Sequence, residues 1–484
     1  MGSLEREGAD ALGLTLYELM LRAGDAVFNQ VRQIWPQKAH WLILCGHGNN
    51  GGDGYVVARL AQAAGLQVTL LACEGSKPLP SAAAEAKKSW LAAGGVIHAP
   101  DAPWPESVDI IIDALLGTGL NRPAKQPYST LINQANLHRA PIFAVDIPSG
   151  LVAATGITPG PTITAAHTLT FIALKPGLLT GRARDHTGKL HYNALGLDSW
   201  LAQKKAPMSR LDECLLRHWL PPRRPTSHKG DHGRLVMIGG DKGTAGAIRL
   251  ASEAALRTGA GLVRVLTHSD NSGPILAARP ELMVDELNDK TIEAALEWAD
   301  VVVIGPGLGQ GQLGKAAIKK VETLQKPMLW DADALNLLAI RPNKGQNRII
   351  TPHPGEAARL LNVKTSEIER DRLHSARCLV KRYGGVVVLK GAGTIIANSE
   401  GELAIADVGN AGMASGGMGD VLSGIIGALV AQKLPLYDAA CTGCVVHGAA
   451  ADNIAARRGT RGILASDLFS QIWLYVNPDM TTIK

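Results

Sequence analysis

A chain of 484 residues is too long for one ordinary domain and predicts two or three, and its 54 glycines with only 4% aromatic residues favour α/β folds rich in tight turns. A formal net charge of +6 is small for this length and gives no reason to expect a nucleic-acid partner. No apolar run approaches the ~18 residues of a membrane span, and the six cysteines follow no disulfide spacing, so we expect a cytoplasmic protein with small-molecule partners and no membrane association.

The first half alternates between helix and strand patterns. An amphipathic helix is expected over residues 14–26. Short apolar runs typical of buried parallel strands follow at 40–45, 67–72, 108–112, 141–145 and 167–174, with a helix at 55–64. Ligands of open parallel sheets lie beyond the carboxyl ends of the strands. We therefore expect four polar residues near these ends to converge at one edge: Asn50, Asp113, Asp146 and Ser149.

The loop at 46–54 allows two interpretations. Its GHGNNG sequence has the glycine spacing of a dinucleotide fingerprint, and Glu74 near the end of the next strand would suit a nicotinamide-dependent dehydrogenase. Against this, Asp53 would lie close to the pyrophosphate that the glycines should admit. Asn49, Asn50 and Asp53 make a loop of amides beside an acid, which better suits a polar ligand or a cation.

Three motifs of this half occur in order: NNGGDG at 49–54, DALLGTG at 113–119 and DIPSG at 146–150. They resemble the NAD(P)H-hydrate epimerase family, and the resemblance covers roughly residues 10–200. It implies a Rossmann-like doubly wound sheet. It also implies an isomerase that interconverts the R and S forms of hydrated NADH and NADPH.

The resemblance implies roles for individual residues. The hydrated nucleotide would contact Asn49, Asn50, Gly51, Gly52, Asp53, Gly117, Thr118, Gly119, Leu120, Asn121, Arg122, Pro123 and Asp146. Asp146 would face the reacting carbon and carry a proton. A potassium ion would lie between Asn50, Asp113 and Ser149, whose oxygens suit a hard, weakly charged ion. The simpler alternative is that Asp113 and Asp146 only cap strand ends.

The alternation loosens between residues 197 and 233. The sequences KKAP at 204–207 and PPRRP at 221–225 break helix and strand alike. We place the junction near residues 200–215, and expect an epimerase domain at 1–205 and a second domain at 215–484.

In the second half, each expected strand ends in glycine, threonine or a charged residue. These strands are expected at 234–238, 300–304, 328–330, 348–350 and 385–389. The polar stretches after them begin at Gly239, Gly305, Asp331, Thr351 and Lys390. Such repeated placement predicts one polar edge of a second parallel sheet.

The stretch GNAGMASGGMGD at 409–420 is the most informative of this half. Apolar residues at helical spacing follow it, so its unpaired N–H groups and the helix dipole predict a phosphate site. A carboxylate ~4 Å from a phosphate costs roughly 4 kcal/mol per pair of unit charges at an effective dielectric of ~20. We therefore interpret Asp420 as a proton acceptor; a capping Asp on a core helix is the alternative.

The second half resembles the ribokinase-like superfamily, whose members end a glycine-rich anion hole with a catalytic Asp. Four motifs in order more closely resemble the NAD(P)H-hydrate dehydratase family: GPGLG at 305–309, TPHPGE at 351–356, KGAGT at 390–394 and GGMGD at 416–420. The match covers about residues 225–475. It implies a lyase of ribokinase-like α/β fold that dehydrates the S hydrate, driven by a nucleotide.

This second resemblance also implies residue roles. The adenine nucleotide would contact Lys390, Gly391, Ala392, Gly393, Thr394 and Gly419, and the hydrate would contact Ala247, Gly307, His353 and Asp420. Likeness to the fused bacterial form implies ADP as co-substrate, with ATP as the alternative. Glu356 matches the acidic position that such kinases use near Mg²⁺, but His353 stands where they often carry Asn, so magnesium ligation stays open.

The motifs together predict a homo-oligomeric fused repair enzyme, in which an epimerase feeds a dehydratase that accepts one epimer. Two other functions stay open: a ribokinase-type kinase for a vitamin precursor such as a hydroxymethylpyrimidine or thiazole, and a nucleotide-sensing protein without turnover. Cys441-x-x-Cys444, followed by His447 and Asp452, has metal-ligand spacing. Its Ala-rich helical run instead predicts buried core cysteines.

Overall fold

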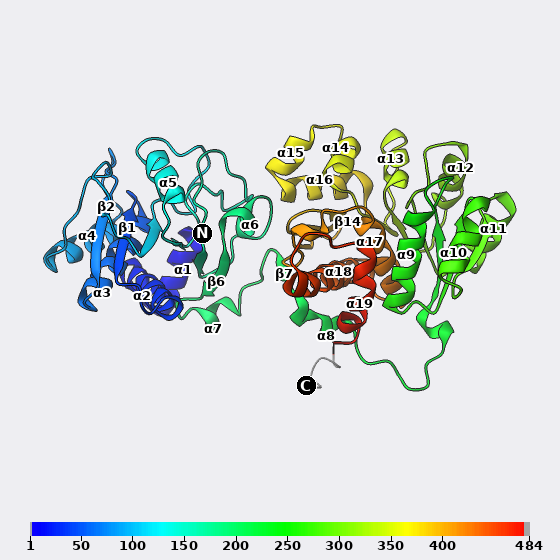
Figure 1. Cartoon of the computed structure of the whole chain (residues 1–484), viewed down its shortest axis with the longest axis horizontal. Helices are drawn as coiled ribbons and strands as arrows, with labels where there is room; N and C mark the ends of the chain where they lie inside the picture. Colours follow the sequence, from blue (N-terminus) through cyan, green and yellow to red (C-terminus); the bar gives the residue numbers. More distant parts are fainter. Residues whose placement is uncertain (1, 479–484) are drawn as a thin grey trace. The chain divides into compact units, whose positions relative to one another are not determined.

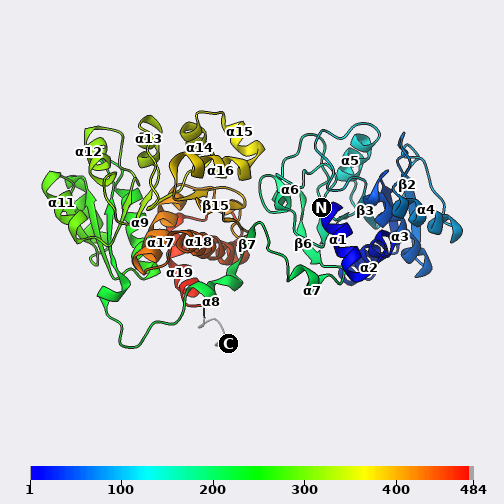
Figure 2. The same cartoon turned by 180° about the vertical axis from the view of Figure 1, so that it is seen from behind.

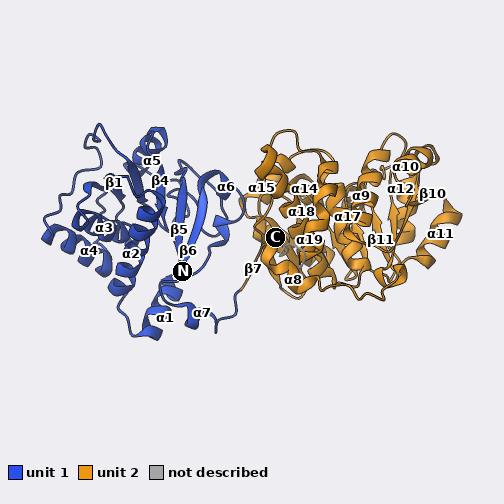
Figure 3. Ribbon diagram, turned by 60° about the horizontal axis from the view of Figure 1, so that its bottom comes forward, with its two compact units in different colours: residues 1–206 blue, residues 207–484 orange. Residues whose placement is uncertain are grey.

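The computed structural model describes residues 2–478. The chain divides into two compact units, Met1–Ala206 and Pro207–Lys484 (Figure 3). Each unit is built around its own sheet and has the α/β class that the sequence predicts. Among the described residues, no helix is both long and apolar enough to cross a membrane.

The first unit contains a six-stranded parallel sheet in the order β2-β1-β3-β4-β5-β6. Its strands are β1 (His40–Cys45), β2 (Gln67–Ala72), β3 (Ile110–Ala114), β4 (Ile142–Val145), β5 (His167–Phe171) and β6 (Lys189–Asn193). Its helices are α1 (Gly2–Leu12), α2 (Leu16–Ile34), α3 (Asn49–Ala63), α4 (Ser81–Ala92), α5 (Tyr128–Leu137), α6 (Ala183–His186) and α7 (Asp198–Leu201).

Helices cover both faces of this sheet (Figures 1 and 2). Alternate side chains of β1 point to opposite faces, so Trp41 and Ile43 pack with α2, α3 and α4, whereas Leu42 and Leu44 pack with α5. Burial on both faces explains why the strands are nearly continuous apolar runs. The order β2-β1-β3 creates a switch point between β1 and β3, where a crevice is expected at the carboxyl edge.

The helix after β1 begins at Asn49 and not at residue 55 as the sequence predicts. The glycines of its first turns allow close packing and do not form an open loop. A Cβ on Gly51 would lie 1.9 Å from the Gly46 carbonyl oxygen, and one on Gly52 would lie 2.6 Å from the Met20 side chain. Close approach, rather than flexibility, therefore accounts for the glycines of this motif.

The second unit contains a ten-stranded sheet in the order β10-β9-β8-β11-β12-β13-β14-β15-β16-β7. Its strands are β7 (Ser209–Leu211), β8 (Arg234–Ile238), β9 (Leu262–Thr267), β10 (Met283–Glu286), β11 (Val301–Ile304), β12 (Met328–Trp330), β13 (Arg348–Ile350), β14 (Val386–Leu389), β15 (Thr394–Asn398) and β16 (Leu403–Ala406). Its helices are α8 (Leu216–Trp219), α9 (Ala245–Thr258), α10 (Ser272–Ala278), α11 (Asp289–Trp298), α12 (Gln312–Val321), α13 (Asp333–Ile340), α14 (Pro354–Leu361), α15 (Thr365–Arg370), α16 (Arg372–Tyr383), α17 (Met418–Ala431), α18 (Leu436–Arg458) and α19 (Phe469–Val476).

The strands from β10 to β14 are parallel, β14, β15 and β16 are antiparallel, and β7 pairs in parallel with β16. A second switch point lies between β8 and β11. The five predicted strands form the middle of this sheet, whereas β7, β9, β10, β15 and β16 were not predicted.

Helices α9, α17 and α18 contribute to one apolar core with the sheet. The crossing of α17 over α9 is close, because a Cβ on Gly424 would lie 1.9 Å from the Ala251 carbonyl oxygen. This contact sets the position of α17, which begins directly after the glycine-rich loop.

Replacing Gly424 with Val should destabilise the second unit, because the added carbons cannot fit without moving a helix. Overpacking of this kind costs about 1–3 kcal/mol. Calorimetry should show a lower transition temperature for that unit. Gly273→Ala on α10, where an added Cβ meets nothing within 4 Å, is the control. Equal transition temperatures for the two variants would contradict the close crossing.

Candidate active sites

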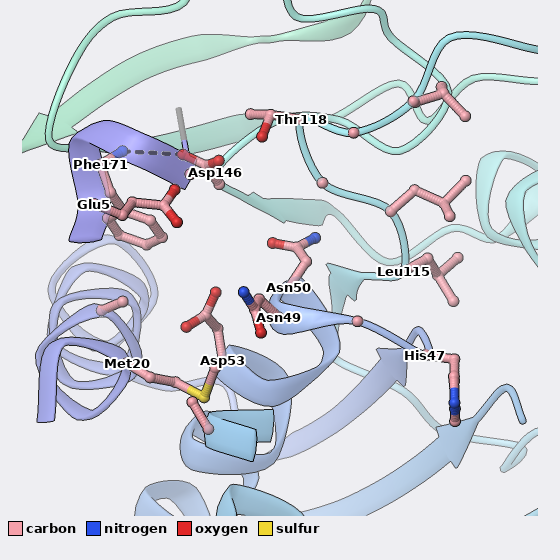
Figure 4. A pocket seen from close by; sticks show the side chains of 18 of the residues that line it. Glu5, Met20, His47, Asn49, Asn50, Asp53, Leu115, Thr118, Asp146 and Phe171 are labelled. Atoms are coloured by element: carbon pink, nitrogen blue, oxygen red, sulfur yellow. Dashed lines mark hydrogen bonds between the residues drawn. The ribbon is translucent and has the colours of Figure 1, made fainter. Parts of the chain in front are cut away.

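A cavity of about 820 Å³ lies at the switch point of the first sheet (Figure 4). Most of the residues predicted for this half line it: Asn49, Asn50, Asp53, Gly117, Thr118, Gly119, Leu120, Asn121, Arg122, Pro123 and Asp146. Four are exceptions: Gly51 and Gly52 are buried inside the packing of α3, and Asp113 and Ser149 are fully buried and do not line the cavity.

Asp146 follows β4 directly and has a φ of 65°, an unusual backbone conformation for a residue with a side chain. Its carboxylate forms an ion pair with the buried ammonium of Lys175. Oδ1 also accepts hydrogen bonds from the Phe171 amide at 3.1 Å and the Thr170 hydroxyl at 3.2 Å (Figure 4). These charge-assisted bonds fix the direction of the Asp146 carboxylate.

Of the three residues predicted to hold potassium, two are hydrogen-bonded to each other and the third contributes an amide. Ser149 donates its hydroxyl to Asp113 Oδ1 at 2.6 Å and its backbone amide to Oδ2 at 2.8 Å. Asp113 lies within β3, not after it, and burial raises the pKa of its carboxyl to about 6. Asn50 is buried, and its Nδ2 has no hydrogen-bond partner among the described residues. Among the described residues, no basic side chain pairs with Asp113. The carboxylate oxygens of Asp113 and the amide oxygen of Asn50, both buried, are ligands of the kind that fits a monovalent cation.

Two charged residues of this site were not predicted. Glu5 lines the cavity from α1, a helix that carries no motif and that the sequence analysis did not identify. Lys175 directly follows the strand expected at 167–174, but it received no role from the sequence, and its pairing with Asp146 depends on the fold. The placement of Lys175 at a strand end is the signal that could have found it.

At the carboxyl edge of the second sheet, Lys390 lies among carboxylates. Its Nζ is 2.9 Å from Asp331 Oδ1 and 3.9 Å from Glu356 Oε2. Asp331 also accepts a hydrogen bond from the Ser423 hydroxyl of α17 at 2.8 Å. A Cβ on Gly419 would lie 3.2 Å from Lys390 Nζ, so the start of α17 approaches the ammonium closely. Asp331 therefore links the predicted residue Lys390 to α17, a role that the sequence analysis did not assign.

Asp420 follows Gly419 on α17 and is half-buried. Burial raises the pKa of Asp420 to about 7, with the Asp331 charge adding to the increase and Lys390 opposing it. The N-cap of α17 is Gly417, so Asp420 is not the capping residue that the alternative requires. A carboxyl with a pKa near neutrality can exchange a proton under ordinary conditions.

The turn predicted to contact the nucleotide is shaped by a buried arginine. Arg372 donates to the carbonyls of Leu389 at 3.2 Å and Lys390 at 3.1 Å. Gly391 has a φ of 144°, and a Cβ there would lie 2.7 Å from the guanidinium. The Thr394 hydroxyl donates to the Gly391 carbonyl at 3.1 Å. Arg372, which was not predicted, thus holds the 390–394 turn in place.

His353 and Glu356 hold each other at the start of α14. The His353 amide donates to Glu356 Oε2 at 2.8 Å, and His353 Nδ1 accepts from the Gly355 amide at 3.0 Å. Burial raises the pKa of Glu356 to about 7. Because this carboxylate already accepts from the backbone and faces Lys390, it fits Mg²⁺ through intervening waters, the mode of binding that this ion often uses.

Gly307 and Ala247 follow β11 and β8, the strands that flank the second switch point. The Gly307 carbonyl accepts from the Thr244 hydroxyl at 2.7 Å. Leu250, one turn after Ala247 on α9, approaches the glycine-rich loop, since a Cβ on Gly417 would lie 2.6 Å from it. Ala247 and Gly307, two of the four residues predicted to contact the hydrate, therefore lie after the strands of the second switch point.

Cys441 and Cys444 belong to the buried core around α18, as the sequence predicts. Within residues 2–478, no group of three or more His, Cys, Asp or Glu is arranged to hold a metal ion. Asp452 instead accepts from the Gly409 amide at 2.7 Å and the Asn410 side-chain amide at 2.8 Å. It anchors the start of the glycine-rich loop to α18.

These two sites define an enzyme with two α/β catalytic units for small polar ligands. A family model described as NAD(P)H-hydrate dehydratase matches residues 235–473, and one described as YjeF-related protein N-terminus matches residues 16–177. The bifunctional NAD(P)H-hydrate repair enzyme of Escherichia coli (strain K12) is 68% identical, over 99% of this chain and 93% of its own. The bifunctional NAD(P)H-hydrate repair enzyme of Vibrio cholerae is 47% identical, over 97% of this chain and 95% of its own. The chain belongs to the family of bifunctional NAD(P)H-hydrate repair enzymes, and the dehydrogenase interpretation of the 46–51 spacing is wrong.

Solved structures resemble the second unit. An ADP/ATP-dependent NAD(P)H-hydrate dehydratase from Bacillus subtilis, co-crystallised with ATP and Mg²⁺, has a TM-score of 0.51 and 30% identity, covering 55% of this chain and 98% of its own. A ribokinase-like superfamily protein from Enterococcus faecalis has a TM-score of 0.53 and 30% identity, covering 57% of this chain and 97% of its own. The predicted ribokinase-like fold is confirmed.

Replacing Lys390 with Met should destabilise the folded chain by about 3–5 kcal/mol at pH 8, because buried carboxylates lose their cation. Since Glu356 and Asp420 have raised pKa values in the folded state, that state binds more protons, and its stability falls as pH rises from about 4 to 7. Without Lys390 both pKa values rise further, so the loss should be smaller at pH 5. Urea unfolding measures the loss of unfolding free energy at pH 8 and at pH 5. Lys381→Met, at an exposed position, is the control. Equal losses at the two pH values would refute this explanation.

Proposed function

We propose that this chain repairs hydrated NADH and NADPH in two steps. The first unit interconverts the R and S hydrates, and the second dehydrates the S hydrate to NAD(P)H. The observation that most strongly supports this proposal is Asp420, a carboxyl with a pKa of about 7 at the start of a helix preceded by a glycine-rich loop.

In the second unit, Asp420 accepts the proton of the hydrate's ring hydroxyl while that oxygen attacks the terminal phosphoryl group of the nucleotide. The unpaired N–H groups before α17 and the Lys390 ammonium stabilise the transferring phosphoryl. The ring nitrogen's lone pair then expels phosphate, a far better leaving group than hydroxide. We propose ADP as the nucleotide, which gives AMP and phosphate. Bound Mg²⁺ would supply neutralisation of phosphate charge near Glu356.

In the first unit, Asp146 moves a proton at the reacting centre, and the ion pair with Lys175 holds its carboxylate in position. Asn50, Asp113 and Ser149 would hold potassium, which would supply positive charge beside the substrate. Six free cysteines support a reducing compartment such as the cytoplasm. The proposed homo-oligomeric state rests on the family resemblance.

An assay with separated R and S hydrates of NADH plus ADP tests both steps, with the return of reduced-nicotinamide absorbance as the readout. Asp420→Asn should slow dehydration of both hydrates by roughly 10²–10⁴-fold and leave epimerisation intact. Asp146→Asn should spare the S hydrate and leave the R hydrate unrepaired apart from slow spontaneous conversion. If Asp420→Asn dehydrates the S hydrate at the normal rate, the proposed role of the second unit is refuted. If Asp146→Asn still converts the R hydrate to the S hydrate enzymatically, the proposed role of the first unit is refuted.

The pH dependence of dehydration should follow Asp420. Because the base must be ionised and its pKa is about 7, kcat/KM for the S hydrate should fall roughly tenfold per pH unit below that value. The rate should level off above pH 8. A profile that stays flat between pH 5.5 and 8 would show that another group accepts the proton.

A further inference from the structure

A third carboxylate of the first cavity comes from outside the known motifs. Glu5 on α1 lines the same space as Asp53 of α3 and Asp146 after β4 (Figure 4). The matched family model begins at residue 16, so it excludes α1. The contribution of Glu5 is therefore a property of the folded unit that no motif indicates.

The helix that carries Glu5 is held by specific packing. Gly8 and Ala9 lie three and four residues after Glu5, on the same side of α1, and both are buried. A Cβ on Gly8 would lie 2.9 Å from Leu197 and 3.3 Å from Trp200. The absence of a side chain at Gly8 lets α1 pack closely against Leu197 and Trp200, and this packing brings Glu5 to the cavity.

Glu5 and Asp146 have contrasting surroundings. Asp146 is paired with Lys175, whereas Glu5 has no ion pair or side-chain hydrogen bond among residues 2–478. Burial raises the pKa of Glu5, the Asp146 charge adds to the increase, and Lys175 opposes it. Burial and both carboxylates raise the pKa of Asp53 well above its usual range. The other charged or titratable residues that line the cavity are His47, Arg122, Lys125 and Tyr128.

We propose that Glu5 is a catalytic residue of the epimerase site, in which its carboxyl donates a proton while the Asp146 carboxylate accepts one. The inference rests on the proposed epimerase function. Two carboxyls that line one cavity in different surroundings, one paired with an ammonium and the other not, suit such a pair of roles. The hydrate suits them, because its hydroxyl oxygen and ring nitrogen are bonded to one carbon.

The proposed step opens and recloses the ring. Asp146 accepts the hydroxyl proton, the freed electron pair forms a C=O bond, and the C–N bond breaks. The electron pair of that bond stays on nitrogen, which takes the proton of Glu5. The aldehyde rotates about its adjoining C–C bond, and nitrogen attacks the opposite face of the carbonyl. Glu5 then recovers its proton from nitrogen, and Asp146 returns its proton to oxygen, so both groups regain their initial state.

The test uses the full chain with Glu5→Gln, an isosteric variant that cannot donate a carboxyl proton. Conversion of R to S hydrate, followed by chromatography without nucleotide, should lose roughly 10²–10⁴-fold in kcat with little change in KM. Because the acid must be protonated, wild-type kcat/KM should fall at high pH, and this fall should disappear in Glu5→Gln. Glu5→Asp should restore part of the rate.

Glu7→Gln is the matched control, since Glu7 lies on the same helix and its ion pair among the described residues is with surface Lys204, at 3.3 Å. It should behave as wild type. Gly8→Leu should displace α1 and reduce epimerisation as Glu5→Gln does, while dehydration of the S hydrate stays normal in every variant. A wild-type rate and pH profile in Glu5→Gln would overturn the inference, whereas no epimerisation by the wild-type chain would refute the proposed function itself.

An oxygen label tests the ring-opening step separately. In H₂¹⁸O, ring opening retains the hydroxyl oxygen, so the newly formed S hydrate should carry no more label than a sample without enzyme. One labelled oxygen per epimerisation event would show that water leaves and returns, and would overturn this step.

Discussion

The partly buried cation of Lys390 is the constraint on which the second site depends. Lys390 follows β14, Asp331 follows β12 and Ser423 belongs to α17, so the ion pair and the hydrogen bond to Asp331 join three elements at one point. Removing carboxylates from water is costly unless a cation compensates them. One lysine compensates Asp331 but leaves Glu356 and Asp420 with pKa values near 7. Incomplete compensation therefore produces a base near neutrality.

The first unit also pairs a lysine with a carboxylate, but there the lysine contacts the proposed base itself. Lys175 binds Asp146 directly, and the backbone amide of Phe171 adds a hydrogen bond, so the Asp146 carboxylate has a cation of its own. No nucleotide phosphate needs to approach this carboxylate, and a permanent negative charge is acceptable. In the second unit, a permanent charge on Asp420 would repel the phosphoryl group. The two sites therefore hold their carboxylates differently because their proposed reactions place different charges beside them.

Much of the fold follows from sequence because buried parallel strands are local apolar runs. The five central strands of the second sheet were predicted in this way. By contrast, β7 is three residues long and pairs with β16 almost 200 positions away, so no local pattern marks it. The start of α3 at Asn49 was missed because its glycines read as a loop, although they serve close packing against Gly46 and Met20.

The sites show the same division between local and long-range information. Motif residues such as Asp146 and Asp420 are visible in sequence because chemistry restricts their type and spacing. Their partners are not visible, because Lys175, Asp331 and Arg372 act through contacts that only folding creates. Glu5 is the extreme case, since it reaches the cavity through the packing of Gly8 against distant side chains.

The two-unit chain also bears on the choice between a dehydratase and a ribokinase-type kinase. Both reactions need a base such as Asp420 and an anion hole before α17, because both begin with phosphoryl transfer to a hydroxyl. They differ in the fate of the phosphate ester: an ester on a carbon beside a ring nitrogen loses phosphate through the nitrogen's lone pair, whereas an ordinary alcohol ester persists. The hydrate also exists as two epimers at this carbon, so an epimerase in the same chain has a substrate only if the second unit acts on the hydrate. The relatives match both units in one chain, and this pairing selects the dehydratase.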